Sequence, residues 1–543
     1  MPSQVPQSLK VGDRIQVDQD VATVRYIGPV DNTDGDWLGV EWDDVSRGKH
    51  SGEKDGKSYF TCRYPGSGSF LRYNAKRVHI GTTLPIALKE KYLPSNPNAL
   101  QDEYDPEKDK GHVQFGGNKS ITVETVGFEK IERKQGNLKN LGVAGLKSMQ
   151  ISSAGSVQEI ANTCPNLTDL DLSNNLIATW DTVLNILAQL PRLRILWLND
   201  MRLIMPLGIN LKPYSPFESL RILSLRNTHI SCQDIRALSP LLVNLAELSV
   251  GCNKWTDVDI VSKEQPCFQN LKLIHLESNE IDSWEKVEIL ENLPSLEQIN
   301  LTANRITSIA PCKANGFKKL QYLHLNENMI SEIQSIDALD TYSALDHVRC
   351  KDNPVFKDMD AYQANVQLVG RIASINRANG NTILPKDRAD MERYYLKLCT
   401  KDAASEEEIV KLHPRYLQLC DKHGKPIADK PDANASSALK NRLLNIRLCQ
   451  RSGSTQPLES VHTASDLPQI IKSADKRILG TMTIRSLQNI VQKLFQIHVS
   501  DQRLYLVQLD KQAAGAVTVQ EITDGLKELK YYNIENGDEI TIL

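Results

Sequence analysis

The sequence predicts a multidomain protein: a small β domain, an α/β solenoid of leucine-rich repeats and a C-terminal α+β domain. Three observations support this prediction. The chain has 543 residues, several times the length of a typical domain. A leucine pattern recurs every 24 to 27 residues through its middle. The two ends lack this period and alternate apolar and polar residues over short runs instead.

The N-terminal segment, residues 1–82, is expected to be a small antiparallel β domain. Its runs at residues 14–17 and 22–26 are short, and the turn signal Asn-Thr-Asp-Gly at residues 32–35 separates such runs. Residues 83–137 begin with a polar stretch that carries prolines at positions 85, 94, 97 and 106, so we expect a linker with at most one short helix.

Residues 138–398 are expected to form leucine-rich repeats with a C-terminal cap. In each repeat, the residues three and five positions after the first leucine should point inward from a short strand, and a turn asparagine should bond to the backbone. A single repeat cannot bury its apolar face, whereas a stack can. The repeats begin at Leu167, Leu193, Leu220, Leu245, Leu271, Leu296, Leu320 and Leu345, and turn asparagines occur at 175, 253, 279, 304, 328 and 353.

The end of the chain, residues 439–543, predicts a β-grasp domain after a second polar linker at residues 399–438. We expect a strand at 444–448, a helix at 484–496 and a strand at 503–509, then a short helix at 522–529 and a last strand at 539–543. The chain ends without Gly-Gly, so this domain should serve for docking and not for conjugation.

Composition excludes several functional classes. Lys and Arg number 64 and Asp and Glu 67, a net charge of -3, which argues against general binding to nucleic acid or membranes. No apolar stretch approaches the roughly 18 residues of a transmembrane helix, and the N-terminus carries no secretory signal. Ten scattered cysteines favour reduced thiols, so we expect a cytoplasmic protein.

Catalytic machinery is not expected. The sequence has no C-x-x-C and no H-E-x-x-H pattern, and the glycine-rich residues 111–120 have the wrong spacing for a phosphate loop. Histidines 275, 324 and 347 fall on predicted repeat strands and are interpreted as surface residues, not as metal or acid–base groups. We therefore predict a protein without enzymatic activity, cofactor or metal.

The N-terminal domain carries the most informative chemistry. Residues 13–44 hold nine acids and two bases, whereas residues 45–80 hold eight bases and two acids. A basic strip beside exposed aromatic side chains suits an acidic peptide that ends in an aromatic residue. Taken singly, the glycines could serve turns, and Trp37 and Phe60 could belong to the core.

Together these residues resemble the CAP-Gly domain family, whose signature is G-K-N-D-G after a W-x-G-V-E run. Gly48, Lys49 and Gly52 match that signature, whereas His50 and Ser51 replace the Asn and Asp. The resemblance implies a groove for the acidic, aromatic-ended C-terminal tail of α-tubulin. The expected groove residues are Trp37, Trp42, Lys49, His50, Ser51, Gly52, Phe60, Phe70 and Arg72.

The order of a CAP-Gly domain, leucine-rich repeats and a ubiquitin-like domain resembles the tubulin-folding cofactor E family. This resemblance implies a cytoplasmic, cytoskeleton-associated chaperone that joins or separates α- and β-tubulin with other tubulin cofactors as partners. The proteasome is a further candidate partner of the ubiquitin-like domain. On the concave face of the repeats we expect partner contacts from Trp197, Arg226, His275, Glu277, His324 and Arg349.

Two other interpretations stay open. A microtubule-associated scaffold could use the same groove to tether polymer ends and leave tubulin dimers intact. A leucine-rich regulatory subunit of an enzyme would leave the CAP-Gly signature unexplained, and removal of residues 1–81 should then not change its function.

Overall fold

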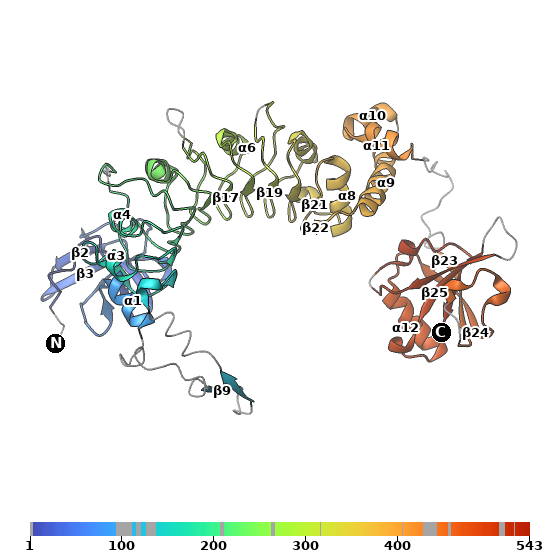
Figure 1. Ribbon diagram of the computed structural model, residues 1–543, viewed down its shortest axis with the longest axis horizontal. Helices are drawn as coiled ribbons and strands as arrows, with labels where there is room; N and C mark the ends of the chain where they lie inside the picture. Colours follow the sequence, from blue (N-terminus) through green and yellow to red (C-terminus); the bar gives the residue numbers. More distant parts are fainter. Residues whose placement is uncertain are drawn as a thin grey trace. The chain divides into compact units, whose positions relative to one another are not determined.

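The computed structural model contains two compact units, Met1–Ile427 and Ala428–Leu543, each with cores of its own (Figure 1). The predicted fold class is confirmed: a β domain and a repeat solenoid form the first unit, and a β-grasp domain forms the second. The structure describes residues 4–93, 111–115, 121–125, 137–206, 211–261, 267–314, 316–403, 405–426, 443–453, 458–509, 516–525 and 527–543.

The N-terminal β domain is a five-stranded antiparallel sheet in the order β6-β3-β2-β1-β7. Its core comes from alternate positions, among them Val24 on β2 and Leu38 and Val40 on β3. A two-residue hairpin, β4 (Glu53–Lys54) and β5 (Lys57–Ser58), lies outside the sheet. The sheet strands are β1 (Arg14–Val17), β2 (Asp20–Pro29), β3 (Asp36–Trp42), β6 (Gly68–Leu71) and β7 (Val78–His79).

The repeats form an eleven-stranded sheet that is parallel from β11 to β21, and β22 pairs antiparallel at the end. Figure 1 shows these strands side by side, with α4 and α6 on one side of the row. The strands are β11 (Val143–Gly145), β13 (Asp169–Asp171), β14 (Ile195–Trp197), β15 (Ile222–Ser224), β16 (Glu247–Ser249), β17 (Leu273–His275), β18 (Gln298–Asn300), β19 (Tyr322–His324), β20 (His347–Arg349), β21 (Arg377–Ala378) and β22 (Asn381–Thr382).

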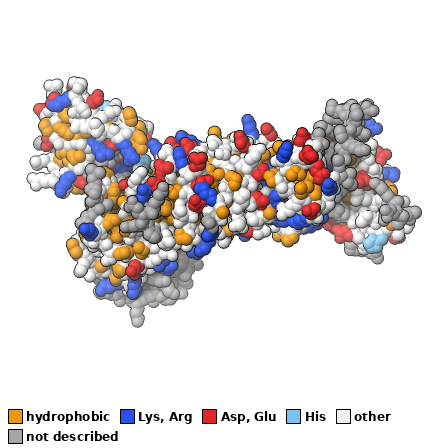
Figure 2. All heavy atoms as spheres, turned by 90° about the horizontal axis from the view of Figure 1, so that it is seen from above, with side chains coloured by type: hydrophobic (Ala, Val, Ile, Leu, Met, Phe, Trp, Pro, Cys, Tyr) orange, Lys and Arg blue, Asp and Glu red, His pale blue; other side chains and the backbone are white. Residues whose placement is uncertain are grey.

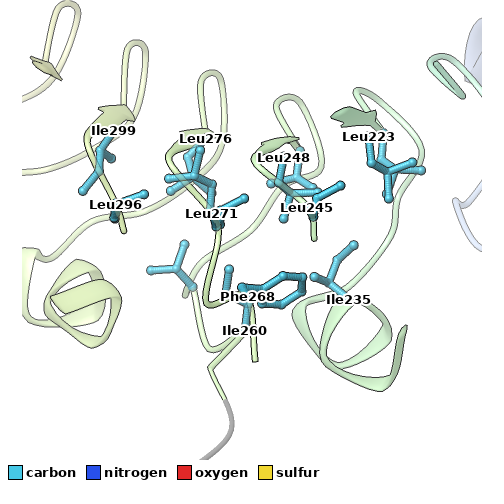
Figure 3. Close-up of a cluster of buried hydrophobic side chains, with 14 of the residues drawn as sticks. Leu223, Ile235, Leu245, Leu248, Ile260, Phe268, Leu271, Leu276, Leu296 and Ile299 are labelled. Carbon is cyan, nitrogen blue, oxygen red and sulfur yellow. The ribbon is translucent and has the colours of Figure 1, made fainter. Parts of the chain in front are cut away.

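The helices of the repeats, with the turns beside them, cover the strands and close one continuous core. Leu223, Leu248 and Ile299, from three repeat strands, point into the interior that Ile235 of α5 and Phe268 also fill (Figure 3). Each of these side chains is at most 2% exposed. The helices are α3 (Glu159–Thr163), α4 (Trp180–Ala188), α5 (Cys232–Leu238), α6 (Trp284–Glu288) and α7 (Gln334–Ala338).

The turn asparagines form a buried ladder of hydrogen bonds, as the repeat pattern predicts. Asn253 donates to the carbonyls of Leu225 and Val250, at 2.8 and 2.9 Å, and its Oδ1 accepts the amide of His229 at 2.7 Å. The asparagine therefore satisfies backbone groups of its own repeat and of the preceding one. Asn175, Asn279, Asn304, Asn328 and Asn353 act in the same way.

The short helix allowed in the first predicted linker is present, but its residues pack into the solenoid and do not act as a linker. Helix α1 (Leu84–Tyr92) buries Leu84 and Leu88 completely in the core of the repeats, and β8 (Thr82–Thr83) pairs with β12 (Ile151–Ser153). Apolar residues among the prolines therefore close the start of the solenoid. Strands β9 (Gly111–Phe115) and β10 (Ile121–Thr125) pair with each other, whereas residues 94–110, 116–120 and 126–136 of the predicted linker lie outside the described residues.

The C-terminal cap is longer than predicted, so the expected linker from residue 399 was wrong up to residue 423. Its helices share a core of their own that includes Tyr395, Leu396 and Leu419. Polar residues of this segment take part in the packing: Lys422 and His423 bond at 2.7 and 2.6 Å to Glu392, which is fully buried on the preceding helix. The elements are α8 (Ala361–Arg371), α9 (Pro385–Asp402), α10 (Glu406–Leu412) and α11 (Tyr416–His423).

The second unit is a mixed five-stranded sheet in the order β24-β23-β27-β25-β26, and α12 (Ile484–Phe495) packs on it. Strands β24 and β26 were not predicted. The expected helix at 522–529 is wrong among the described residues: Ile522 ends β26, which pairs with β25, Glu528 bridges Thr483, and a 3-10 helix spans Leu529–Tyr532 instead. The strands are β23 (Leu443–Arg451), β24 (Ile470–Leu479), β25 (Leu504–Leu509), β26 (Val517–Ile522) and β27 (Glu539–Ile542). Within the described part of the chain, no helix combines the length and apolar character needed to span a membrane.

Candidate functional site

A cluster of aromatic rings lies on the N-terminal β domain, centred on Phe70 of β6. The sequence predicted that Trp37, His50 and Phe60 belong to one site, and the structure brings them together around this ring, although Phe60 is only 7% exposed and offers little surface to a ligand. Two tyrosines of the cluster were not predicted. Ring centroids lie 5.0 Å from Phe70 for His50, 5.4 Å for Phe60, 5.5 Å for Tyr59, 6.4 Å for Tyr26 and 6.5 Å for Trp37.

Small residues make this cluster possible. A Cβ on Gly39 of β3 would lie 2.4 Å from a ring carbon of Phe60, so the glycine leaves the space that this ring occupies. A Cβ on Gly48 would lie 1.9 Å from the carbonyl oxygen of Gly66, so two loop backbones approach each other closely. The glycines of the motif therefore set the shape of the site.

The loop at residues 48–52 is held by its own side chains. His50 Nδ1 accepts the amide of Gly52 at 3.0 Å, and Ser51 Oγ accepts the amide of Gly66 at 3.0 Å. Gly52 has φ +106° and a Cβ there would lie 2.0 Å from the Phe60 carbonyl oxygen, so only glycine fits. The exposed Lys49 side chain has no ion pair among the described residues.

The hydrogen bond to Gly52 fixes the tautomer of His50. Because Nδ1 accepts this bond, Nε2 carries the proton of the neutral ring and remains a donor. Burial and the neighbouring Lys49 lower the pKa of His50, so the ring is neutral at pH 7. The loop therefore offers one ammonium and one imidazole N–H beside the aromatic cluster.

Of two more expected groove residues, Arg72 lies beside the cluster and Trp42 does not. The Arg72 guanidinium lies 4.1 Å from the ring centroid of Trp37, at the edge of the cluster. Trp42, expected in the groove, is instead 6% exposed in the core and donates from Nε1 to Ser69 Oγ at 3.0 Å. Alternation along β3 explains this result, because Trp42 lies on the same face as the buried Leu38 and Val40.

The uneven charge of the two halves of this domain is partly neutralised by ion pairs between them. Basic residues of the second half reach acidic residues of the first, so the basic strip is smaller than the sequence suggests. Figure 2 shows basic and acidic side chains interspersed on the face that it presents. The pairs are Arg47–Asp20 at 2.6 Å, Lys57–Asp31 at 2.9 Å and Arg77–Asp18 at 2.5 Å.

The repeat strands present a second set of expected residues. The ladder register aligns Trp197, His275, His324 and Arg349 in one row across the sheet, together with Asp171, Ser224, Ser249 and Asn300. Arg226 and Glu277 form an ion pair, and His275 lies 3.8 Å from Glu277 and 3.5 Å from Glu247.

The histidines of this face are not all surface residues. His347 is only 5% exposed, and its ring lies between Tyr322 and His324, at centroid distances of 5.5 and 5.8 Å. The interpretation of His347 as an exposed residue was therefore wrong. Burial and the charge of Arg349 lower the pKa of His324 to about 4, so its ring is neutral at pH 7.

An aromatic cluster beside a glycine–lysine loop, a leucine-rich-repeat solenoid and a β-grasp domain define a class: CAP-Gly proteins with repeat and ubiquitin-like modules. Residues 11–76 match the CAP-Gly domain family, and residues 269–330 match the leucine rich repeat family.

Over nearly its whole length, the chain is similar to curated proteins of one kind. It is 32% identical to the tubulin-specific chaperone E of Homo sapiens and 29% identical to the tubulin-folding cofactor E of Arabidopsis thaliana, covering 97% and 92% of both chains. Among solved structures, the C-terminal ubiquitin-like domain of mouse tubulin-specific chaperone e is 21% identical, covers 20% of this chain and 91% of its own, and has a TM-score of 0.14. The chain belongs to the tubulin-specific chaperone E family.

Proposed function

We propose that this protein is a non-enzymatic tubulin chaperone whose groove around Phe70 binds the acidic C-terminal tail of α-tubulin. The observation that carries this proposal is the aromatic cluster with Lys49 at its side, since no ion pair of Lys49 occurs within the part of the chain that the structure describes. Membership of the tubulin-specific chaperone E family supports the tubulin part of the proposal. The proposal that the ligand is the C-terminal tail, and not another part of tubulin, rests on the chemistry of the groove.

Different groove residues bind the terminal ring and the carboxylates of the tail. The terminal aromatic ring of the tail packs against the partly exposed rings of Phe70 and Trp37, which supply most of the affinity, whereas Phe60 is only 7% exposed and packs against Phe70. Lys49 and the Nε2–H of His50 bind the carboxylates. Because these charges are exposed, each ion pair contributes about 1 kcal/mol or less and weakens with salt.

The repeats would contact the body of tubulin. Their strand face combines Trp197 with the charged and polar residues Arg226, His275, Glu277, His324 and Arg349, which suits a protein surface better than a small molecule. Other tubulin cofactors are the partners proposed for the assembly or separation of the heterodimer, and the β-grasp domain is proposed to dock such partners or the proteasome. The protein would assemble or separate the heterodimer in the cytoplasm.

Charge reversal in the loop tests the groove. Lys49→Glu removes one attraction and adds one repulsion, so affinity for an acidic peptide ending in Tyr should fall about 5- to 30-fold at low salt and less at high salt. Lys76→Glu is the matched control, because Lys76 is also exposed and has no ion pair among the described residues. Equal losses in both variants, measured by calorimetry, would reduce the groove to non-specific charge attraction.

The rival function is a scaffold that tethers microtubule ends through the same groove. Sizing the products after mixing the full chain with tubulin heterodimer, with and without partner cofactors, separates the two. A chaperone yields free subunits or a complex with one subunit, whereas a scaffold leaves dimers intact and binds polymer.

A further inference from the structure

The N-terminal β domain contacts the repeats through a polar seam around Tyr64. The Tyr64 ring lies 5.7 Å from the His229 ring and 4.5 Å from Lys254 Nζ, measured between centroids and from Nζ to the centroid. Its hydroxyl is 3.4 Å from His229 Nδ1 and 3.5 Å from Lys254 Nζ. Gln150 adds a hydrogen bond to Gln16 at 3.1 Å. The two parts of the first unit therefore share a defined contact.

A pocket of about 70 Å³ opens at this seam, away from the aromatic groove. This volume holds a few water molecules or one carboxylate or phosphate group. Its walls come from both sides, with Arg25, Arg63 and Tyr64 from the β domain and Arg202 and His229 from the repeats.

The two carboxylates of the pocket are already engaged. Asp43 accepts two bonds from Arg14, the shorter at 2.5 Å. Glu41 binds Arg25 at 2.6 Å and also accepts the backbone amide of Arg63 at 2.6 Å. Both acids are therefore bonded to arginines other than Arg202, although the charge of Asp43 still acts on Arg202.

Three cations around the pocket have no carboxylate partner among the described residues: Arg63, Arg202 and Lys254. The half-buried Arg202 donates from one nitrogen, Nη1, to the carbonyls of Asn227 and Met201, at 2.7 and 3.0 Å, which leaves its other N–H groups available. Burial and these three cations lower the pKa of His229 to about 4, so the histidine adds no charge at pH 7.

We propose that this seam pocket binds a single oxyanion group, a carboxylate or a phosphate, between Arg63 of the β domain and Arg202 of the repeats. An anion there forms charge-assisted hydrogen bonds with guanidinium groups from both sides. Its binding therefore ties the CAP-Gly domain to the solenoid. This site is separate from the tail groove and does not depend on it.

Calorimetry on the full chain with inorganic phosphate, in a buffer of low ionic strength, tests the proposal. We expect saturable binding that weakens at least about tenfold in Arg202→Gln and in Arg63→Gln. Arg63 is exposed, so its variant keeps the test valid if Arg202→Gln destabilises the fold. Arg194→Gln, an exposed arginine of a neighbouring repeat, should bind like the wild type.

The absence of saturable binding, or equal affinity in all three variants, would overturn the proposal. A pentaglutamate peptide distinguishes the two sources of the oxyanion. Competition of this peptide with phosphate, in the Lys49→Glu background that weakens the groove, identifies a protein carboxylate as an occupant; phosphate binding that the peptide does not displace identifies a phosphate site.

Discussion

The asparagine ladder predicts a large loss of stability from one small substitution, Asn279→Ala. Asn279 is 5% exposed and makes four hydrogen bonds to the backbone. Its Oδ1 accepts the amides of Asn253 and Trp255 at 2.9 and 3.0 Å, and its Nδ2 donates to the carbonyls of Val250 and Leu276 at 3.2 and 3.0 Å. The substitution removes all four bonds while leaving the strands in place.

The size of the stability loss depends on which of the four backbone groups bonded to Asn279 keep a second hydrogen-bond partner. The Val250 carbonyl still accepts from Asn253 Nδ2, and the Leu276 carbonyl still accepts from Asn304 Nδ2, both at 2.9 Å. The two amides lose their acceptor, and a buried donor left unsatisfied costs about 1 to 3 kcal/mol. We therefore expect a loss of about 2 to 6 kcal/mol in the free energy of unfolding.

Urea denaturation followed by tryptophan fluorescence measures this loss. All six tryptophans lie between residues 37 and 284, so the signal reports on the first unit alone. Hydrogen exchange then locates the opening, because repeats lose structure locally. The matched control is Asn270→Ala, since Asn270 is exposed and should cost no more than about 0.5 kcal/mol. Equal destabilisation of both variants would show that the asparagine hydrogen bonds do not stabilise the turns.

Three other predictions concern single positions. Gly52→Ala should abolish binding of a Tyr-ended acidic peptide in calorimetry, because its Cβ would lie 2.0 Å from the Phe60 carbonyl oxygen at a φ of +106°. Gly370→Ala should lower the melting temperature of the cap helices, measured by circular dichroism, because its Cβ would lie 2.2 Å from the Tyr395 ring. Because the folded pKa of His324 is about 4 and the ordinary value is 6.5, the unfolded chain binds the proton first; urea midpoints should therefore fall as the pH drops from 6.5 towards 4, and less so in His324→Asn.

The repeats could be predicted in detail because each position has its own chemistry in a fixed period. Leu248 must be apolar to fill the core, and Asn253 must reach two carbonyls, so the sequence carries both requirements every 25 or so residues. The cap has no such period. Lys422 and His423 bind Glu392, which lies some 30 residues earlier in the chain, and a charged segment such as residues 399–423 has the composition of a linker until such a partner is known.

The candidate groove was only partly predictable for a similar reason. Its loop residues follow one another in the sequence, so the glycine–lysine motif located Lys49 and His50 directly. Tyr26 and Tyr59 reach Phe70 only through the folding of the sheet, and no local pattern marks them. Trp42, in contrast, could have been assigned to the core from the alternation of β3.

The packing of residues 82–92 changes how tail capture would act. With a flexible linker from residue 83, the groove would only raise the local concentration of tubulin near the repeats. Because α1 lies in the repeat core, β8 pairs with β12, and Tyr64 contacts His229, the groove is instead held by the solenoid itself. A captured tail would then reach the repeats at a distance set by packing and not by linker length. Removal of residues 1–81 would also uncover the repeat surface beneath Tyr64, so a loss of function in that truncation would not isolate the groove, whereas Lys49→Glu changes the groove alone.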